Sequence, residues 1–337
     1  MTEARALPEG TAGPVVTLTA AGAIDATYRL PVPLERGAFV RASGWEREVS
    51  GKGVNVSAAL RAAGVTTAAV VVLGADDVAF AAQSPLADVL RIVTVPGATR
   101  VNTSIIDAGG ATTKVNAPTP PLTPAAWEET RSAVVGACRA LAASWLVVSG
   151  TLPEVTGAEA RIADVVRAVR GAGVRVAVDT SGAALAELVA DPAEVALLKP
   201  NTHELAELVG RPLRTIGEVT AAARELVARG VATVYTSMGA DGVLVVTDAA
   251  VIHARAVAPA VVNTAGAGDA SLAGFLHGLG GASGGRAALT TAASTAASWG
   301  ALAVSRPTTL LDAVEAAPRA VVTDEPDPAT RLTEPAV

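Results

Sequence analysis

The sequence contains almost none of the residues that form disulfides and zinc sites: one cysteine, Cys138, and three histidines in 337 residues. A single cysteine excludes an intrachain disulfide, and the histidines are too dispersed along the chain for a Cys/His zinc site. Aromatic residues make up only 3% of the chain, whereas 50% of it is hydrophobic. We therefore expect a core packed from small aliphatic side chains, mostly alanine and valine.

The sequence also lacks an excess of basic residues and any long uncharged apolar run. Its formal net charge of −6 argues against nucleic acid as a partner, because phosphate backbones attract basic surfaces. No apolar run is long enough to span a bilayer, and segment 1–14 has charges but no apolar core of a secretory signal. We expect a cytoplasmic protein that binds neither nucleic acid nor membrane. A local cluster of positive groups must meet any anionic ligand.

Through most of its length the sequence alternates between strand and helix patterns. Helices are predicted near 124–142, 158–171, 182–189 and 217–229, and strands at 145–148, 174–178, 195–198 and 231–236. This alternation predicts an α/β fold with a mostly parallel sheet covered by helices on both faces. Two β-prone segments, 28–49 and 100–115, predict a small sheet standing off the main domain.

The two ends of the chain differ in composition from the part between them. Residues 1–14 are predicted to form a flexible tail, and residues 15–315 one α/β domain. Residues 316–337 are polar and rich in proline, which predicts a disordered C-terminal tail.

The stretch Asn263–Asp269 combines glycines with a carboxylate just before an apolar-periodic run that ends at Leu279. That periodicity predicts a helix beginning near Gly268. Gly266 and Gly268 leave backbone N–H groups able to face an anion, and the helix dipole is expected to keep Asp269 ionised as a proton acceptor. This arrangement suggests phosphoryl transfer to a hydroxyl. A glycine-rich loop whose aspartate merely caps a helix fits the heptapeptide equally well.

Polar segments follow four predicted strands, at the sheet edge where open α/β sheets bind ligands. They are Ser149–Pro153, Asp179–Gly182, Lys199–Glu204 and Ser237–Gly242. Other phosphate-site motifs are absent from the sequence. Gly51-Lys52 is followed by Gly53, which excludes a P-loop, and Ser271 replaces the third glycine of a dinucleotide-binding fingerprint. No Gly-x-Ser-x-Gly nucleophile elbow occurs.

Six motifs follow one another in a fixed order between about residues 15 and 305. They are Gly51-Lys52-Gly53-Val54-Asn55-Val56, Thr99-Arg100-Val101-Asn102, Ser149-Gly150-Thr151-Leu152-Pro153, Lys199-Pro200-Asn201-Thr202-His203-Glu204-Leu205, Ser237-Met238-Gly239-Ala240-Asp241-Gly242 and Ala265-Gly266-Ala267-Gly268-Asp269. Together they resemble the ribokinase-like PfkB sugar kinases, and within them the 1-phosphofructokinase, tagatose-6-phosphate kinase and minor 6-phosphofructokinase branch. The resemblance implies a three-layer α/β/α sandwich with a β-sheet lid at about 26–50 and 98–118. It also implies a homodimer formed through the lid, and ATP- and Mg²⁺-dependent phosphorylation of a sugar hydroxyl.

The resemblance also implies roles for individual residues. Asp269 would be the base, with Gly266, Ala267 and Gly268 as backbone donors to the phosphoryl group. Nucleotide contacts would come from Lys199, Asn201, Ser237, Gly239, Gly242 and Thr264. Mg²⁺ would be held by Asn201 and Glu204, largely through water, as suits a hard cation that retains its waters. Sugar contacts would come from Asp25, Gly51, Lys52, Asn55, Arg100, Asn102 and Thr151.

Arg100 bears most directly on the substrate. The matching arginine of the phosphosugar branch meets the phosphate already on the sugar, and guanidinium suits phosphate geometry. Lys52 and Lys114 could add charge there. The alternatives are a surface cation of the lid for Arg100 and solvated roles for the two lysines.

Three sugar-side motifs depart from the family pattern. Ala20-Ala21-Gly22 replaces Pro-Asn-Pro, Ser50 replaces a glycine, and Ala117 replaces the glutamate of Asn-Glu-Pro. The leading hypothesis is a kinase of fructose 1-phosphate, followed by fructose 6-phosphate or tagatose 6-phosphate. A family member recruited to another sugar or polyol, and a catalytically inactive nucleotide-binding module, are the alternatives.

Overall fold

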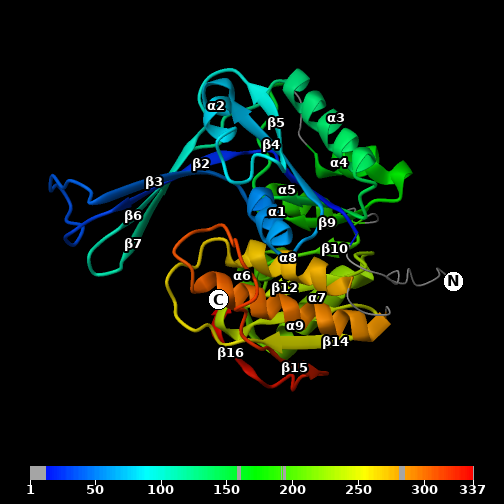
Figure 1. Cartoon of the computed structure of the whole chain (residues 1–337). Coiled ribbons are helices and arrows are strands. Elements are labelled where there is room, and N and C mark those ends of the chain that lie inside the picture. The colour runs from blue at the N-terminus through cyan, green and yellow to red at the C-terminus, as the bar shows by residue number, and fades with distance from the viewer. Residues whose placement is uncertain (1–12, 158–160, 191, 193–194, 281–284, 337) are drawn as a thin grey trace.

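A computed structural model describes residues 13–157, 161–190, 192, 195–280 and 285–336. Its centre is a long sheet with the strand order β15-β14-β13-β12-β10-β9-β8-β1-β4-β5 (Figure 1). These strands are β1 (Val15–Thr19), β4 (Thr67–Gly74), β5 (Leu90–Val95), β8 (Trp145–Ser149), β9 (Arg175–Asp179), β10 (Leu197–Leu198), β12 (Val234–Ser237), β13 (Val243–Val246), β14 (Val251–Arg255) and β15 (Val321–Asp324). Pairing is parallel from β12 to β5 and antiparallel from β12 to β15. The predicted α/β fold with a mostly parallel sheet is confirmed.

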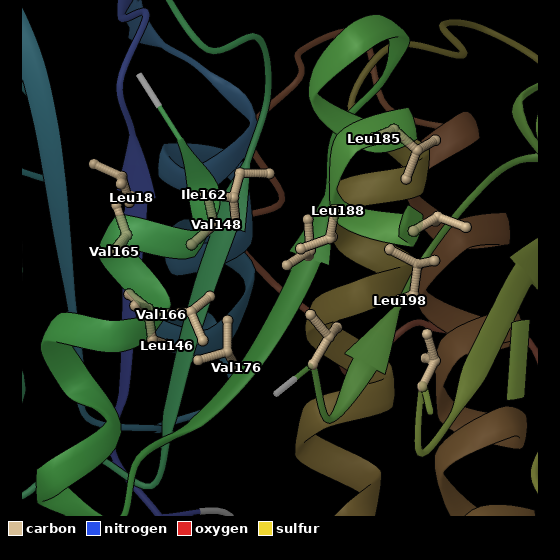
Figure 2. Close-up of a cluster of buried hydrophobic side chains, with 14 of the residues drawn as sticks. Leu18, Leu146, Val148, Ile162, Val165, Val166, Val176, Leu185, Leu188 and Leu198 are labelled. Atoms are coloured by element: carbon tan, nitrogen blue, oxygen red, sulfur yellow. The ribbon is translucent and has the colours of Figure 1, made fainter. Parts of the chain in front are cut away.

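Helices cover both faces of this sheet. They are α1 (Lys52–Ala62), α2 (Val78–Ala81), α3 (Pro124–Ala140), α4 (Ile162–Val169), α5 (Gly182–Ala190), α6 (Thr202–Val209), α7 (Ile216–Ala228), α8 (Ala267–Leu279) and α9 (Gly285–Val304). Side chains alternate along a strand, so Leu146 and Val148 pack under α3 to α7, whereas Trp145 and Val147 pack under α1, α8 and α9. Figure 2 shows part of the first of these clusters, where the labelled side chains are leucine, isoleucine and valine. Trp127 is the one aromatic residue in this cluster of described residues, as the scarcity of aromatic residues predicts.

A second sheet forms the lid, which extends to one side of the main body in Figure 1. Its order is β3-β2-β6-β7, with β2 (Ala23–Arg29), β3 (Gly44–Ser50), β6 (Val101–Ile106) and β7 (Thr112–Asn116). The two faces differ in character because side chains alternate along each strand. Asp25 lies beside Glu48 and Asn102 on the polar face, and Tyr28 lies beside Trp45 on the apolar face.

The C-terminal segment was expected to be disordered, and this prediction is wrong for residues 316–336. β15 pairs with β14 at the edge of the main sheet, and β16 (Arg331–Ala336) pairs with β11 (Leu213–Thr215). Leu332 and Ala336 are buried. A polar, proline-rich composition does not show that the segment pairs with strands far away in the sequence, here β14 and β11.

The predicted N-terminal tail is also too long by at least one residue. The backbone carbonyl of Pro14 accepts a hydrogen bond from the N–H of Ser144, at 2.8 Å, so position 14 is already part of the domain. Residues 1–12 of that tail lie outside the described residues, as do the first residues of the helix predicted at 158–171. No helix in the described ranges is long and apolar enough to cross a membrane.

Candidate active site

The start of α8 separates two cavities. Gly266 precedes the helix with φ of 78°, and a Cβ there would lie 2.5 Å from the carbonyl oxygen of Thr309. Only glycine fits this left-handed, crowded position. Gly266 lines one cavity, which we call the lid cavity, whereas Ala267 and Gly268 line the other, which we call the helix cavity. The amides at the positive end of the helix therefore lie where the two cavities meet.

The lid cavity has a volume of about 300 Å³ and lies under the polar face of the lid. All seven predicted sugar-side residues line it: Asp25, Gly51, Lys52, Asn55, Arg100, Asn102 and Thr151. Lys114 lines it as well. Residues from three distant parts of the chain therefore meet around one polar space.

Several polar atoms of the lid cavity lack a partner within the described residues. Asp25 accepts hydrogen bonds from Ser50 Oγ at 2.7 Å and Asn102 Nδ2 at 3.1 Å. The buried Oδ1 atoms of Asn55 and Asn102, and Oγ1 of Thr19, have no hydrogen-bond partner among those residues. Buried polar groups are normally paired, so these atoms fit a ligand that carries many hydroxyls.

The helix cavity is larger, about 700 Å³, and its wall is partly apolar. Five of the six predicted nucleotide residues line it, and they come from the ends of β10 and β12 and the approach to α8: Asn201, Ser237, Gly239, Gly242 and Thr264. Apolar wall is supplied by Val257 and Val261 and by residues of α9, including Ala301 and Val304. Lys199, the sixth, is buried beside Gly268, where an added Cβ would lie 3.3 Å from its Nζ.

Asp269 is 5% exposed and accepts a hydrogen bond from Asn55 Nδ2 at 2.8 Å. The expectation that the helix dipole keeps it ionised stays a prediction, because burial acts in the opposite direction. Burial, reinforced by the nearby Asp179, raises the pKa of Asp269 to about 7, against the opposing effects of Asn55, Lys52 and Lys199. Such a pKa suits a general base at neutral pH.

Asp179, at the end of β9, links two lysines. Its carboxylate oxygens lie 2.9 Å from Lys52 Nζ and 3.0 Å from Lys199 Nζ, and Asp179 is 1% exposed. Burial of Asp179 opposes its ionisation, but the attraction of Lys199 and Lys52 holds its pKa below the usual range. The pKa of Lys199 is raised because Asp179 and Asp269 outweigh its burial. The sequence placed Asp179 at a strand end near the site but gave no sign of this pairing.

Arg100 lines the lid cavity but uses most of its donors within the chain. Its Nε donates to the carbonyl of Gly22 at 3.2 Å, and Nη2 donates to the carbonyl of Ala21 at 3.0 Å. Nη1 donates to Thr119 Oγ1 at 3.0 Å and to the carbonyl of Ala117 at 3.4 Å. Arg100 is therefore an anchored, half-buried cation rather than a mobile surface one, and little of its donor capacity is left for a ligand.

The two residues nominated for Mg²⁺ bond to each other as a capping box at the start of α6. Asn201 Oδ1 accepts from the N–H of Glu204 at 2.9 Å, and Glu204 Oε2 accepts from the N–H of Asn201 at 2.8 Å. Asn201 lines the helix cavity, whereas Glu204 lines a separate cavity of about 300 Å³ between α5 and α6. No cluster of three or more His, Cys, Asp or Glu side chains that could hold a metal occurs in the described residues. This geometry fits contact through water better than direct ligation.

Comparisons with known proteins agree with this fold. Residues 14–315 match the family described as pfkB family carbohydrate kinase. The chain is 36% identical to a 1-phosphofructokinase of Haloferax volcanii over 79% of this chain and 85% of that protein. It is 35% identical to a 1-phosphofructokinase of Rhodobacter capsulatus over 78% and 83%. Phosphofructokinase-2 from Escherichia coli, in complex with potassium, superposes with a TM-score of 0.76 at 26% identity, covering 89% of this chain and 95% of that one. The chain belongs to the pfkB family of carbohydrate kinases.

Proposed function

We propose that this enzyme transfers the γ-phosphoryl group of ATP to the free primary hydroxyl of fructose 1-phosphate, giving fructose 1,6-bisphosphate and ADP. The observation that carries the proposal is the position of the start of α8. It lies between a polar cavity that fits a sugar and a larger, partly apolar cavity that fits a nucleotide. The relatives named 1-phosphofructokinase support the acceptor. Sugar metabolism of this kind is consistent with a cytoplasmic protein.

In the proposed reaction the acceptor hydroxyl approaches Asp269 from the lid cavity. Asp269 takes the hydroxyl proton as the oxygen bonds to the γ-phosphorus, and the bond from that phosphorus to the β–γ bridging oxygen breaks to release ADP. The amides at Gly266–Gly268 stabilise charge on the transferred group, with Lys199 buried beside them. Mg²⁺ accompanying the nucleotide would neutralise phosphate charge, held near Asn201 through water.

A second candidate acceptor is a sugar or polyol without a phosphate. Arg100 favours it, because its donors already bind the carbonyls of Ala21 and Gly22 and the Thr119 hydroxyl. Ala21 and Gly22 belong to the segment that departs from the family's Pro-Asn-Pro pattern. Arg47, Lys52 and Lys114 also line the lid cavity. Arg47 is paired with Asp77, so a phosphate on the substrate would depend on Lys52 and Lys114 more than on Arg100 alone.

An acceptor panel with ATP and Mg²⁺ tests the proposal. Fructose 1-phosphate should give the highest kcat/KM, and Lys114→Met should lower that value by roughly 10-fold or more, as expected for a lost charged contact. Activity on fructose, which lacks the phosphate, should not change in the same variant. The measurement is ADP release with each acceptor.

The panel also separates the alternatives. Turnover only with an unphosphorylated sugar or polyol, unchanged by Arg100→Ala and Lys114→Met, would favour the second candidate. Binding of ATP without turnover of any acceptor would favour an inactive nucleotide-binding module. Arg100→Ala is used together with Lys114→Met because loss of Arg100 also removes four internal hydrogen bonds.

We also propose that two copies pair through the apolar face of the lid. Tyr28, Trp45, Val101 and Val115 are 37%, 56%, 39% and 60% exposed on this face. The rings of Tyr28 and Trp45 lie 6.3 Å apart. Contiguous exposed apolar side chains on a twisted sheet mark an interaction surface, and a second lid offers a matching one.

Trp45→Glu is expected to convert the dimer to a monomer, because a charge at the centre of an apolar interface is desolvated without a partner. Sedimentation velocity measures the change. Val321→Glu is the matched control, since Val321 is 72% exposed on β15, away from the lid. A Trp45→Glu protein that sediments like the wild type would contradict pairing through this face.

A further inference from the structure

The C-terminal strand β16 is tied to the nucleotide side of the site. The family match ends at residue 315, and β16 lies beyond it. The carboxylate of Asp241, in the loop Ser237–Gly242, accepts hydrogen bonds from the N–H of Thr333 at 2.6 Å and from its Oγ1 at 2.7 Å. The N–H of Glu334 donates to the same carboxylate at 3.4 Å. Asp241 is 9% exposed, so these contacts are shielded from water.

This attachment places Glu334 in the wall of the helix cavity. The cavity is lined by Glu334 together with Gly239, Gly242 and Arg255. The carboxylate lies directly against Gly239, where an added Cβ would be 2.5 Å from Oε2. The loop is held from its other side by Arg255, whose Nε donates to the carbonyl of Ala240 at 2.9 Å. The Glu334 carboxylate makes no hydrogen bond or ion pair with the residues that the structure describes.

The charge of Glu334 restricts what can lie against it. A carboxylate repels phosphates, whose place is at the amides of Gly266–Gly268. An aromatic base would pack on the apolar wall formed by residues such as Val257 and Val304. In a nucleotide the ribose joins the base to the phosphates. The ribose carries two hydroxyl groups that can donate hydrogen bonds. An ionised carboxylate can accept from both of them.

We propose that Glu334 accepts hydrogen bonds from the ribose hydroxyls of the bound nucleotide, so that β16 completes the nucleotide site. The proposal rests on the proposed function only in taking the helix cavity as the ATP site. It assigns a specificity-determining contact to a strand outside the family match. Asp241 acts as the positioning residue that holds this strand.

Glu334→Ala tests the proposal, with Glu325→Ala as the matched control in the same C-terminal segment. Glu334 is exposed and its side chain makes no hydrogen bond with the described residues, so truncation of that side chain should leave the thermal midpoint unchanged. The KM for ATP should rise about 10-fold or more in Glu334→Ala, as for loss of a charged hydrogen bond, with kcat within about twofold. Glu325→Ala should match the wild type.

The analogue 2′,3′-dideoxy-ATP tests whether Glu334 contacts the ribose hydroxyls, because it lacks both of them. The wild type should bind it at least 10-fold more weakly than ATP, and Glu334→Ala should bind the two equally, in calorimetric titrations. An unchanged affinity for ATP in Glu334→Ala would overturn the proposal, as would an equal loss for ATP and its dideoxy analogue. Calorimetry needs no turnover. A wild type that binds ATP and fails with every acceptor would therefore contradict the proposed function while still testing Glu334.

Discussion

Asp269→Asn is expected to lower kcat by about 10²- to 10⁴-fold, the usual effect of losing a general base. Asparagine can still accept the hydrogen bond from Asn55 but cannot take a proton from the acceptor hydroxyl. The KM for ATP should stay within about twofold, since the amides of the helix start are unchanged. Steady-state kinetics with the best acceptor of the panel measures both quantities.

The pH profile provides the control. A base must be ionised to act, and the pKa of Asp269 is raised to about 7. The wild-type kcat/KM should therefore fall as pH drops below about 7, and the residual activity of Asp269→Asn should not show this decrease at low pH.

The Asp269→Asn variant should also be no less stable than the wild type at pH 8. An acid whose pKa is higher folded than unfolded destabilises the fold once it ionises, and asparagine carries no charge. A kcat within about threefold of the wild type would show that another group is the base.

Sequence patterns predicted the parts of this site that depend on local geometry. The helix predicted from Gly268 begins at Ala267, and the small sheet predicted from segments 28–49 and 100–115 is formed by β2, β3, β6 and β7. The glycines and polar residues at strand ends were assigned correctly to one edge, because parallel strands bring their carboxyl ends together. The predicted sugar-side residues then meet in the lid cavity, although their roles stay predictions.

Features that depend on distant residues were not predictable from local patterns. The strands β5 and β14 were missed because neither alternates strictly between apolar and polar residues, although the turn signal Pro96-Gly97 follows β5. The raised pKa of Asp269 depends on the depth at which Asp179 and the helix are buried, which no motif encodes. The position of β16 depends on Asp241, 92 residues before Thr333. Such pairings appear only once the chain is folded.

Asp179→Asn is expected to lower the free energy of unfolding by about 3–5 kcal/mol, the usual effect of removing one partner of a buried ion pair. Lys199 is 5% exposed and would lose the group that chiefly keeps its pKa raised. Lys52, whose side chain is 39% exposed, can turn to water and contributes little to this loss. Urea denaturation of the two proteins measures the difference, provided that the slope against urea is the same for both.

The double variant Asp179→Asn/Lys199→Met separates stability from catalysis. It removes both buried charges, so most of the lost stability should return, since an uncharged pair avoids the desolvation of two ions. Its kcat should remain low, because no cation lies beside Gly268 to meet the transferred phosphoryl group. Recovery of both stability and kcat would show that Lys199 serves only the fold.

If Asp179→Asn instead lowers the free energy of unfolding by less than about 1 kcal/mol, the ion pair behaves like an exposed one, with water reaching the carboxylate of Asp179.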